Sequence, residues 1–404
     1  MTDARFAAAC STRHDSILAL REAAEALEDG LGGRSPDLLV AFASSQHSGE
    51  AEVLASILGE LTRARVLLGC IAESVVGGGH EYEHKPAVAL WAVAAEALQV
   101  TPFRVSAHPA EGWEDDEQPR IEYSGHPDLG RLDTGPGSSA LVLGDPFSFP
   151  MADYLEGLSA EAPELVVSGG MASGGTRPGE TALFLGGERW NSGMVGVHLS
   201  GGIAPTTVVS QAYRPIGKPW VVTDCSGSVV RKLGGRAAAK VLMETLDALP
   251  EEDRGLLQSA PMLGVAWDAA RSTFESTDFL AHPIRGVAPQ EEAIVVLGEV
   301  RRGLTVQLMI RDPRTAGDDL ARRLERHAGE RPGTPESAGA LLFTCNGRGS
   351  RMFDERDHDS RRVHAALGAD LPLAGFFAMG EVARIGEGSQ LHGFTASTVI
   401  YRGV

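Results

Sequence analysis

Two stretches near the carboxyl terminus decide the fold: residues 341–353 read LLFTCNGRGSRMF, and residues 371–401 read LPLAGFFAMGEVARIGEGSQLHGFTASTVIY. Leu341–Thr344 is an apolar run long enough for a buried strand, and Asn346–Gly349 follows it with two glycines. Asp357 and Asp359 supply the negative charge that a helix N-terminus favours. Leu371–Leu373 then re-enters the core. The pattern predicts strand, glycine loop, helix and strand, a unit that binds ligands at its strand ends in α/β proteins.

Three motifs in this region resemble the C-terminal module of the FIST family, the F-box and intracellular signal transduction proteins. They are Cys345-Asn346-Gly347-Arg348-Gly349, then Pro372–Phe377, then Gly380-Glu381. Gly169–Ser173 and Tyr213–Gly217 resemble segments of the N-terminal FIST module. The Arg311-Asp312 pair before a helix also resembles the family pattern. The resemblance covers about Asp37 to Tyr401.

The resemblance implies a cytoplasmic sensory protein that binds a small ligand, such as an amino acid, in signal transduction. Since no effector segment of the kind fused to many relatives is apparent, either the output would pass to a separate signalling protein or the chain has no signalling output. Some family members resemble haem-binding nitric-oxide sensors, so a haem-binding gas sensor is one alternative. The other is an enzyme that uses a thiol or a carboxylate. The cofactor is left open.

Composition narrows the class of partner. The 404 residues include 36 Lys and Arg against 54 Asp and Glu, a net charge of −18, and phosphate binding needs concentrated positive charge, so nucleic acid is not expected. The four cysteines lie far apart, which predicts neither a disulfide framework nor a zinc ribbon and fits a reducing cytoplasm. No apolar run reaches the ~18 residues of a membrane span, and the Arg and Ala content suggests a bacterial source.

The fold class predicted is α/β, with two modules of mixed sheets flanked by helices. We expect an N-terminal helical segment at 1–36, a first module at 37–222 and a second at 223–404. Gly-x-x-Ala follows a predicted strand–helix–strand three times, at Gly69–Ala72, Gly169–Ala172 and Gly375–Ala378. A repeated unit would explain this, and chance in a chain with 49 glycines is the alternative. Residues 294–300 and 304–310 predict a hairpin.

The expected ligand site is a pocket between the modules, where glycine turns follow apolar strands. Its predicted lining is Gly69, Cys70, Gly170, Met171, Cys345, Arg348, Gly375, Phe376 and Glu381. The Arg348 charge could lower the pKa of the Cys345 thiol, which keeps a thiol enzyme open beside a ligand-lining thiol. Glu381 is a lone carboxylate, suited either to a ligand contact or to a loop-fixing hydrogen bond. No residue is assigned as catalytic.

His80-Glu81-Tyr82-Glu83-His84 matches the H-E-x-x-H pattern, which binds zinc when a helix places both histidines one turn apart. Three glycines precede it and Pro86 follows, at a helix cost of about 1 kcal/mol per glycine and ~3 for proline. A non-helical segment without zinc is therefore predicted, with either histidine as an alternative metal or haem ligand. The glycine-rich stretch 168–175 could cradle a phosphate, although a tight turn is favoured.

Two polar stretches are candidate reporters of ligand binding. They are Glu111–Pro136, expected to be a surface excursion, and Arg348–Asp359, whose three arginines and three aspartates offer partners for two ordered states. A loop with few apolar residues has low local stability, so a ligand could order it. The second loop is favoured because it follows the Cys345 turn directly.

Overall fold

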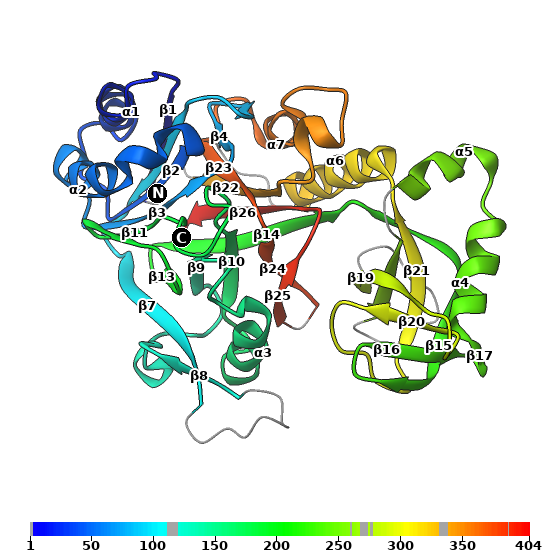
Figure 1. The fold of residues 1–404 in the computed structure, drawn as a ribbon. Coiled ribbons are helices and arrows are strands. Elements are labelled where there is room, and N and C mark those ends of the chain that lie inside the picture. Colours follow the sequence, from blue (N-terminus) through cyan, green and yellow to red (C-terminus); the bar gives the residue numbers. More distant parts are fainter. Residues whose placement is uncertain are drawn as a thin grey trace. The chain divides into compact units, whose positions relative to one another are not determined.

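The computed structural model describes residues 3–110, 120–258, 261–266, 274, 278–330, 338–386 and 388–404. Two compact units are present: unit 1 is Met1–Val209 with Leu320–Val404, and unit 2 is Ser210–Asp319 (Figure 1). Each contains mixed or antiparallel sheets with helices packed on them. The predicted α/β class is confirmed.

Unit 1 contains three copies of a strand–helix–strand motif whose two strands are parallel neighbours. The first copy is β2 (Leu38–Ser44), α2 (Ala51–Thr62) and β3 (Val66–Ala72). The second is β9 (Ser139–Gly144), α3 (Met151–Glu161) and β10 (Val166–Met171). The third is β22 (Ala338–Cys345), α7 (His358–Leu367) and β23 (Leu373–Ala378). The three first strands are buried along their whole length, as parallel strands covered on both faces are.

Each copy continues with a hairpin and a returning strand. These are β4 (Val75–Gly77), β5 (His80–Tyr82) and β6 (Val88–Ala94); β11 (Leu183–Leu185), β12 (Glu188–Trp190) and β13 (Met194–Ser200); and β24 (Glu381–Ile385), β25 (Gly388–His392) and β26 (Thr395–Gly403). The returning strand pairs antiparallel with the first strand of its own copy. An opening strand flanks it: β1 (Arg5–Ser11), β7 (Gln99–Pro109) or β14 (Ile203–Gln211). β8 (Ile121–Ser124) pairs antiparallel with the end of β7.

The three copies exchange their hairpins in a cycle. The hairpin of the first copy joins the third through β4 and β23, that of the second joins the first through β11 and β3, and that of the third joins the second through β24 and β10. Each sheet is therefore completed by a neighbouring copy. This arrangement confirms that the three Gly-x-x-Ala segments mark a repeated unit.

The first position of each Gly-x-x-Ala segment requires glycine for the same physical reason. A Cβ atom on Gly69 would lie 2.2 Å from the Ala41 carbonyl oxygen of the parallel neighbour. At Gly169 the corresponding oxygen belongs to Val142 and at Gly375 to Leu342, each at 1.9 Å. Such a separation excludes any side chain, so glycine allows the paired strands to approach.

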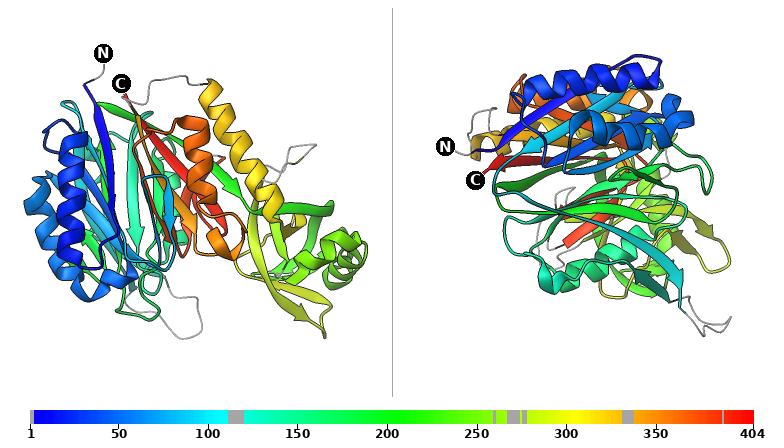
Figure 2. Two further views of the ribbon diagram at one scale, coloured as in Figure 1. Left: turned by 90° about the horizontal axis from the view of Figure 1, so that it is seen from above. Right: turned by 90° about the vertical axis from the view of Figure 1, so that its left-hand side faces the viewer.

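Helices cover the outer faces of the three sheets, and one core lies between them (Figure 2). Helices α1 (Ser16–Gly30) and α2 pack on the first sheet, α3 on the second, and α7 with the latter part of α6 (Pro313–Glu330) on the third. The central core contains Phe42, Phe343 and Phe376, whose ring centroids lie 5.0–6.3 Å apart. Such aromatic pairs contribute about 0.5–1.5 kcal/mol each beyond burial.

Unit 2 is inserted into the third copy: it begins at the end of β14 and ends within α6. Its strands are β15 (Tyr213–Ser226), β16 (Val229–Leu233), β17 (Arg236–Ala237), β18 (Met262–Ala266), β19 (Phe279–Ala288), β20 (Ala293–Val296) and β21 (Thr305–Arg311). Helices α4 (Ala238–Asp247) and α5 (Glu251–Arg254) accompany them. The unit has its own apolar core, built around Val222, Leu242 and Leu308.

Two predictions about elements need correction. The strands predicted at 294–300 and 304–310 do not form a hairpin, because β20 pairs with β16 and β19 whereas β21 pairs with β15 and β18. The segment 1–36 contains the predicted helix, begun by a hydrogen bond from the Leu18 amide to the Asp15 side chain, and also strand β1, which was not predicted. Of the predicted surface excursion, residues 111–119 lie outside the described residues.

Candidate functional site

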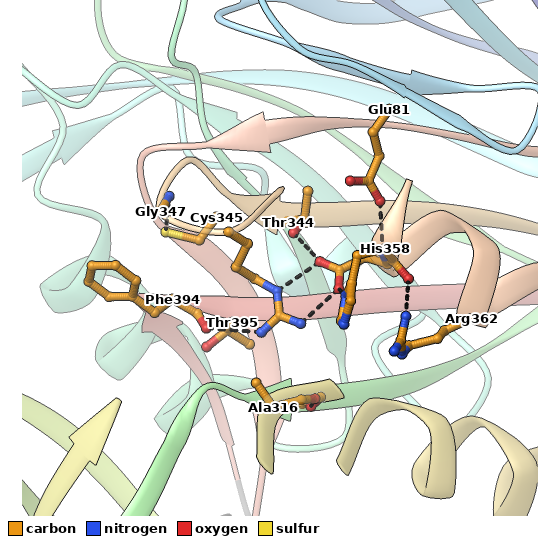
Figure 3. Close-up of polar contacts among 12 residues, drawn as sticks. Glu81, Ala316, Thr344, Cys345, Gly347, His358, Arg362, Phe394 and Thr395 are labelled. Carbon is orange, nitrogen blue, oxygen red and sulfur yellow. Dashed lines mark hydrogen bonds and ion pairs between the residues drawn. The ribbon is translucent and has the colours of Figure 1, made fainter. Parts of the chain in front are cut away.

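A buried ion pair lies just beyond the carboxyl end of β22. The Arg348 Nε and Nη2 atoms each lie 2.7 Å from a different carboxylate oxygen of Asp359, and the two side chains are 0% and 1% exposed. Thr344 donates its hydroxyl to Asp359 at 2.6 Å, and His358 Nδ1 lies 2.7 Å from the same carboxylate (Figure 3). The ring of Phe353 stacks on His358.

These contacts decide the charge of the pair. Burial alone would raise the pKa of Asp359, but the Arg348 charge and its hydrogen bonds outweigh burial and hold that pKa well below its usual range. Burial lowers the pKa of His358. The ion pair is therefore charged at neutral pH, and loss of one partner would leave an uncompensated buried charge at a cost of about 3–5 kcal/mol.

Glu81, on the exchanged hairpin, caps helix α7. One of its carboxylate oxygens accepts hydrogen bonds from the Asp359 and Ser360 amides, each at 2.8 Å. In return Asp357 accepts the Glu81 amide at 2.8 Å. Burial and the neighbouring Asp359 charge raise the pKa of Glu81 to about 8. The first copy thus supplies the N-terminal cap of a helix in the third.

The H-E-x-x-H stretch is non-helical, as predicted, because His80–Tyr82 forms strand β5. Its two histidines have separate partners: His80 Nδ1 lies 3.0 Å from Asp357 and His84 Nδ1 lies 3.4 Å from Glu73. Within the described residues, no group of three or more His, Cys, Asp or Glu side chains is placed to hold a metal. The absence of bound zinc stays a prediction.

Glu381, the first residue of β24, is 0% exposed. One carboxylate oxygen accepts the Thr395 amide at 3.0 Å, whereas Oε1 has no hydrogen-bond partner in the described part of the chain. The Cys345 thiol is a neighbour, and burial raises the pKa of Glu381 well above its usual value. Burial and Glu381 together raise the pKa of Cys345. The thiol is therefore protonated at neutral pH, the opposite of what a nucleophile needs.

The internal repeat gives Glu381 two counterparts. Glu381 lies opposite Gly170 on the neighbouring copy, Val75 opposite Phe376, and Leu183 opposite Cys70. Val75 and Leu183 are both fully buried and apolar. This position of the fold therefore accepts an aliphatic side chain. Of the three counterparts, only Glu381 of the third copy has a carboxyl group.

The end of each first strand also differs between copies. Register places Cys345 opposite Ala378 and Ser44 opposite Ala72, which makes Cys345 the counterpart of Ser44. Ser44 accepts the Ala87 amide with its hydroxyl at 2.9 Å. In the third copy the corresponding amide, that of Thr395, is accepted by Glu381 instead. The Cys345–Glu381 pair thus replaces a Ser–Val pair at the same place.

The structure brings together part of the predicted lining. Gly170 and Met171 lie against Glu381 and Gly380, since Met171 exchanges backbone hydrogen bonds with Gly380 and Met379 at 2.8 and 3.0 Å. A Cβ on Gly170 would be 3.3 Å from the Phe376 ring. Gly69 and Cys70 lie on β3, and Cys70 belongs to the same buried cluster as Phe376.

The prediction that Gly69, Gly170 and Gly375 lie in turns is wrong. Gly69, Gly170 and Gly375 lie within strands, because the turn begins only after the alanine of each Gly-x-x-Ala segment. The stretch 168–175 likewise begins as strand. Its following residues join strand ends: the Ser173 hydroxyl accepts the Glu73 amide at 2.8 Å and donates to the Phe377 carbonyl. The carboxyl ends of β3, β10 and β23 consequently meet.

The loop 348–359 also differs from expectation. Arg348 and Asp359 were predicted to be polar partners available to a mobile loop, but they are buried against each other. The loop between them is held by the first copy: Ser350 donates to Glu83, with its hydroxyl at 2.6 Å, and Arg351 lies 2.5 Å from Glu73. Glu81 and Glu83 were missed as binding partners because H-E-x-x-H directs attention to zinc.

Family models match this chain over most of its length: the FIST N domain at residues 37–236 and the FIST C domain at residues 238–384. The chain belongs to the FIST family. FIST domains are associated with sensing in signal transduction and with small-ligand binding. The two models meet inside unit 2, and the division at 36 and 222 stays a prediction.

Relatives of this FIST protein cover its whole length. A protein of Mycobacterium tuberculosis is 37% identical over 400 residues, which cover 98% of this chain and 99% of the relative. A protein of Mycobacterium bovis is 37% identical over 401 residues, 98% of each chain. Both are described as uncharacterized. No helix in the described ranges combines the length and the apolar character needed to cross a membrane.

Proposed function

We propose that this FIST protein is a cytoplasmic sensor that binds a small ligand at Glu381 and Cys345. The supporting observation is the Glu381 carboxyl group, fully buried with one oxygen unpartnered in the described chain. An unpaired buried polar group of this kind costs about 1–3 kcal/mol. The counterparts Val75 and Leu183 indicate that the fold does not need it. A cost that the fold does not require is expected at a functional site.

The chemistry of the site favours a ligand with an amino group. Burial raises the pKa of Glu381 well above its usual value and so favours the protonated form. An ammonium group beside the free oxygen would stabilise the ionised form, so binding would release a proton. Affinity should then increase with pH, by up to about tenfold per unit below the folded pKa of Glu381.

The environment of Cys345 favours binding over catalysis, since a protonated, buried thiol is a poor nucleophile. A haem site has less support, because His80 and His84 each lie beside a carboxylate. The signal would leave through loop 348–359, which adjoins the site, toward a separate signalling protein.

Titration of the purified protein with free amino acids and simple primary amines, followed by calorimetry at several pH values, tests the proposal. We expect saturable binding by at least one amine that strengthens from pH 6 to 8. Glu381→Gln should weaken it at least tenfold. Glu60→Gln, on the exposed face of α2, is the matched control and should not. Binding of equal strength in wild type and Glu381→Gln would contradict the assignment.

A further inference from the structure

A second cavity lies wholly within unit 2, with a volume of about 480 Å³. It forms where β15 bulges away from β21: Ile216 pairs with Leu308 but Trp220 pairs with Val306, so β15 contains two extra residues. Gly217 adopts a φ of +64°, and a Cβ there would lie 2.8 Å from Thr245 on helix α4. The bulge therefore contacts α4, and residues of both elements line a space in the size range of small-molecule sites.

Part of the cavity lining is cationic and aromatic. Lys218 places its ammonium 4.4 Å from the centre of the Trp220 ring, and no carboxylate in the described chain pairs with it. Arg236 lies 5.8 Å from the same ring centre and also binds Glu244 at 2.7 Å. The wall therefore keeps one uncompensated positive charge beside an aromatic face, although the chain carries −18.

Apolar side chains also line the cavity. Ile216, Val241 and Leu249 are buried and line the cavity. Beside them Arg214 is held by two carboxylates, Asp253 at 2.8 Å and Asp312 at 3.1 Å. The cavity lining thus combines apolar side chains with the ammonium group of Lys218, which no carboxylate in the described chain pairs with.

This arrangement also explains two family-like motifs that the Glu381 site does not use. Tyr213–Gly217 lies on β15, and Arg311-Asp312 lies at the end of its partner strand β21; the Arg214–Asp312 ion pair joins the two motifs. Asp312 in addition accepts the Arg314 amide at 3.1 Å and the Thr315 hydroxyl at 3.0 Å, at the start of α6. The cavity wall is therefore bonded to the helix by which the chain leaves unit 2.

We propose that this cavity is a second ligand site, which binds a small organic anion with an apolar body. The anionic group would lie at Lys218, and the apolar body would pack on Trp220, Val241 and Leu249. Such a ligand would contact both Lys218 and the apolar side chains. A cation would be repelled by the Lys218 charge, and a fully polar anion would make no contact with the apolar side chains.

The test uses the full chain and two probes, 1-naphthoate and decanoate, titrated by calorimetry beside the neutral 1-naphthylmethanol. We expect saturable one-to-one binding of at least one anion and weaker binding of the neutral analogue. Lys218→Met should weaken the anion about tenfold, the effect of one charge-assisted contact. Lys240→Met, which lies on α4 outside the lining, should leave it unchanged.

The two proposed sites fail independently. Glu381→Gln should not alter naphthoate or decanoate binding, and Lys218→Met should not alter amine binding. Absence of saturable binding by both anions would overturn the proposal. Equal weakening by Lys218→Met and Lys240→Met would also overturn it, because it would indicate general charge attraction.

Discussion

The third copy of the repeat and the first two place different chemistry on the same backbone. Where the first copy has Val75 and Ser44, the third has Glu381 and Cys345, and the second has Leu183 in the place of Glu381. The hairpin exchange and the glycine of each Gly-x-x-Ala segment are common to all three. What is shared therefore reports on folding, and what is particular to one copy is a candidate for function.

The largest expected effect on the free energy of unfolding comes from introducing a carboxyl group at the corresponding position of the first copy. Val75→Glu would bury an acid beside Phe376, where the Ala87 amide is already bonded to Ser44. Keeping such a group neutral at pH 7.5 costs about 4 kcal/mol or more if its pKa rises above neutrality. Denaturant unfolding should show this loss, and Val75→Leu should cost under about 1.5 kcal/mol. A tolerated Val75→Glu would break the comparison.

Next comes the ion pair of the third copy. Arg348→Ala should lower the free energy of unfolding by about 3–5 kcal/mol, because Asp359 would remain buried without its partner. The double variant Arg348→Met with Asp359→Leu should recover much of this loss. Arg13→Ala, which breaks an exposed pair with Glu22, is the control and should cost under about 1 kcal/mol. Equal effects at both places would show that burial does not matter here.

The glycines common to the three copies test whether the shared features are needed for folding. Gly69→Ala, Gly169→Ala and Gly375→Ala should each destabilise by at least about 1–3 kcal/mol, the usual range for overpacking, since each methyl group would meet a carbonyl oxygen. Gly59→Ala is the control: it lies in α2 with open space around it and should stabilise by up to about 1 kcal/mol. A neutral result at only one of the three would argue that the copies are not equivalent.

A smaller effect is expected in the pH dependence of stability. Glu81 and Glu381 have raised pKa values in the folded chain, about 8 for Glu81, against about 4.3 when unfolded. Unfolding therefore releases protons between these values, and stability falls as pH rises from about 4.3 toward 8. Asp359 has the opposite sign, because its stabilisation is lost at acid pH. Glu381→Gln should reduce the slope by up to about 1.4 kcal/mol per pH unit, and Glu60→Gln should not.

The sequence predicted the local elements of the site better than their partners. Leu341–Thr344 and its loop, helix and following strand were identifiable because apolar runs, glycines and helix-end charges are local signals. The hairpin exchange could not be identified from the sequence, because β4 and β23 pair across almost 300 positions of the chain. Nothing in either segment specifies that pairing. The distant pairing is a second reason, beside the zinc-like H-E-x-x-H pattern, why Glu81 was missed as the cap of α7. Gly78 and Gly79, both at positive φ between two short strands, were the available signal for a hairpin.

The central claim is that Glu381 and Cys345 are present for a ligand and not for the fold. The most direct test is the free energy of unfolding of the double variant Cys345→Ser with Glu381→Val, which recreates the Ser44–Val75 arrangement of the first copy and gives the Thr395 amide a hydroxyl acceptor. We expect it to be at least as stable as the wild type in the absence of ligand. A loss of about 2 kcal/mol or more, the ordinary cost of deleting a needed buried contact, would contradict the claim.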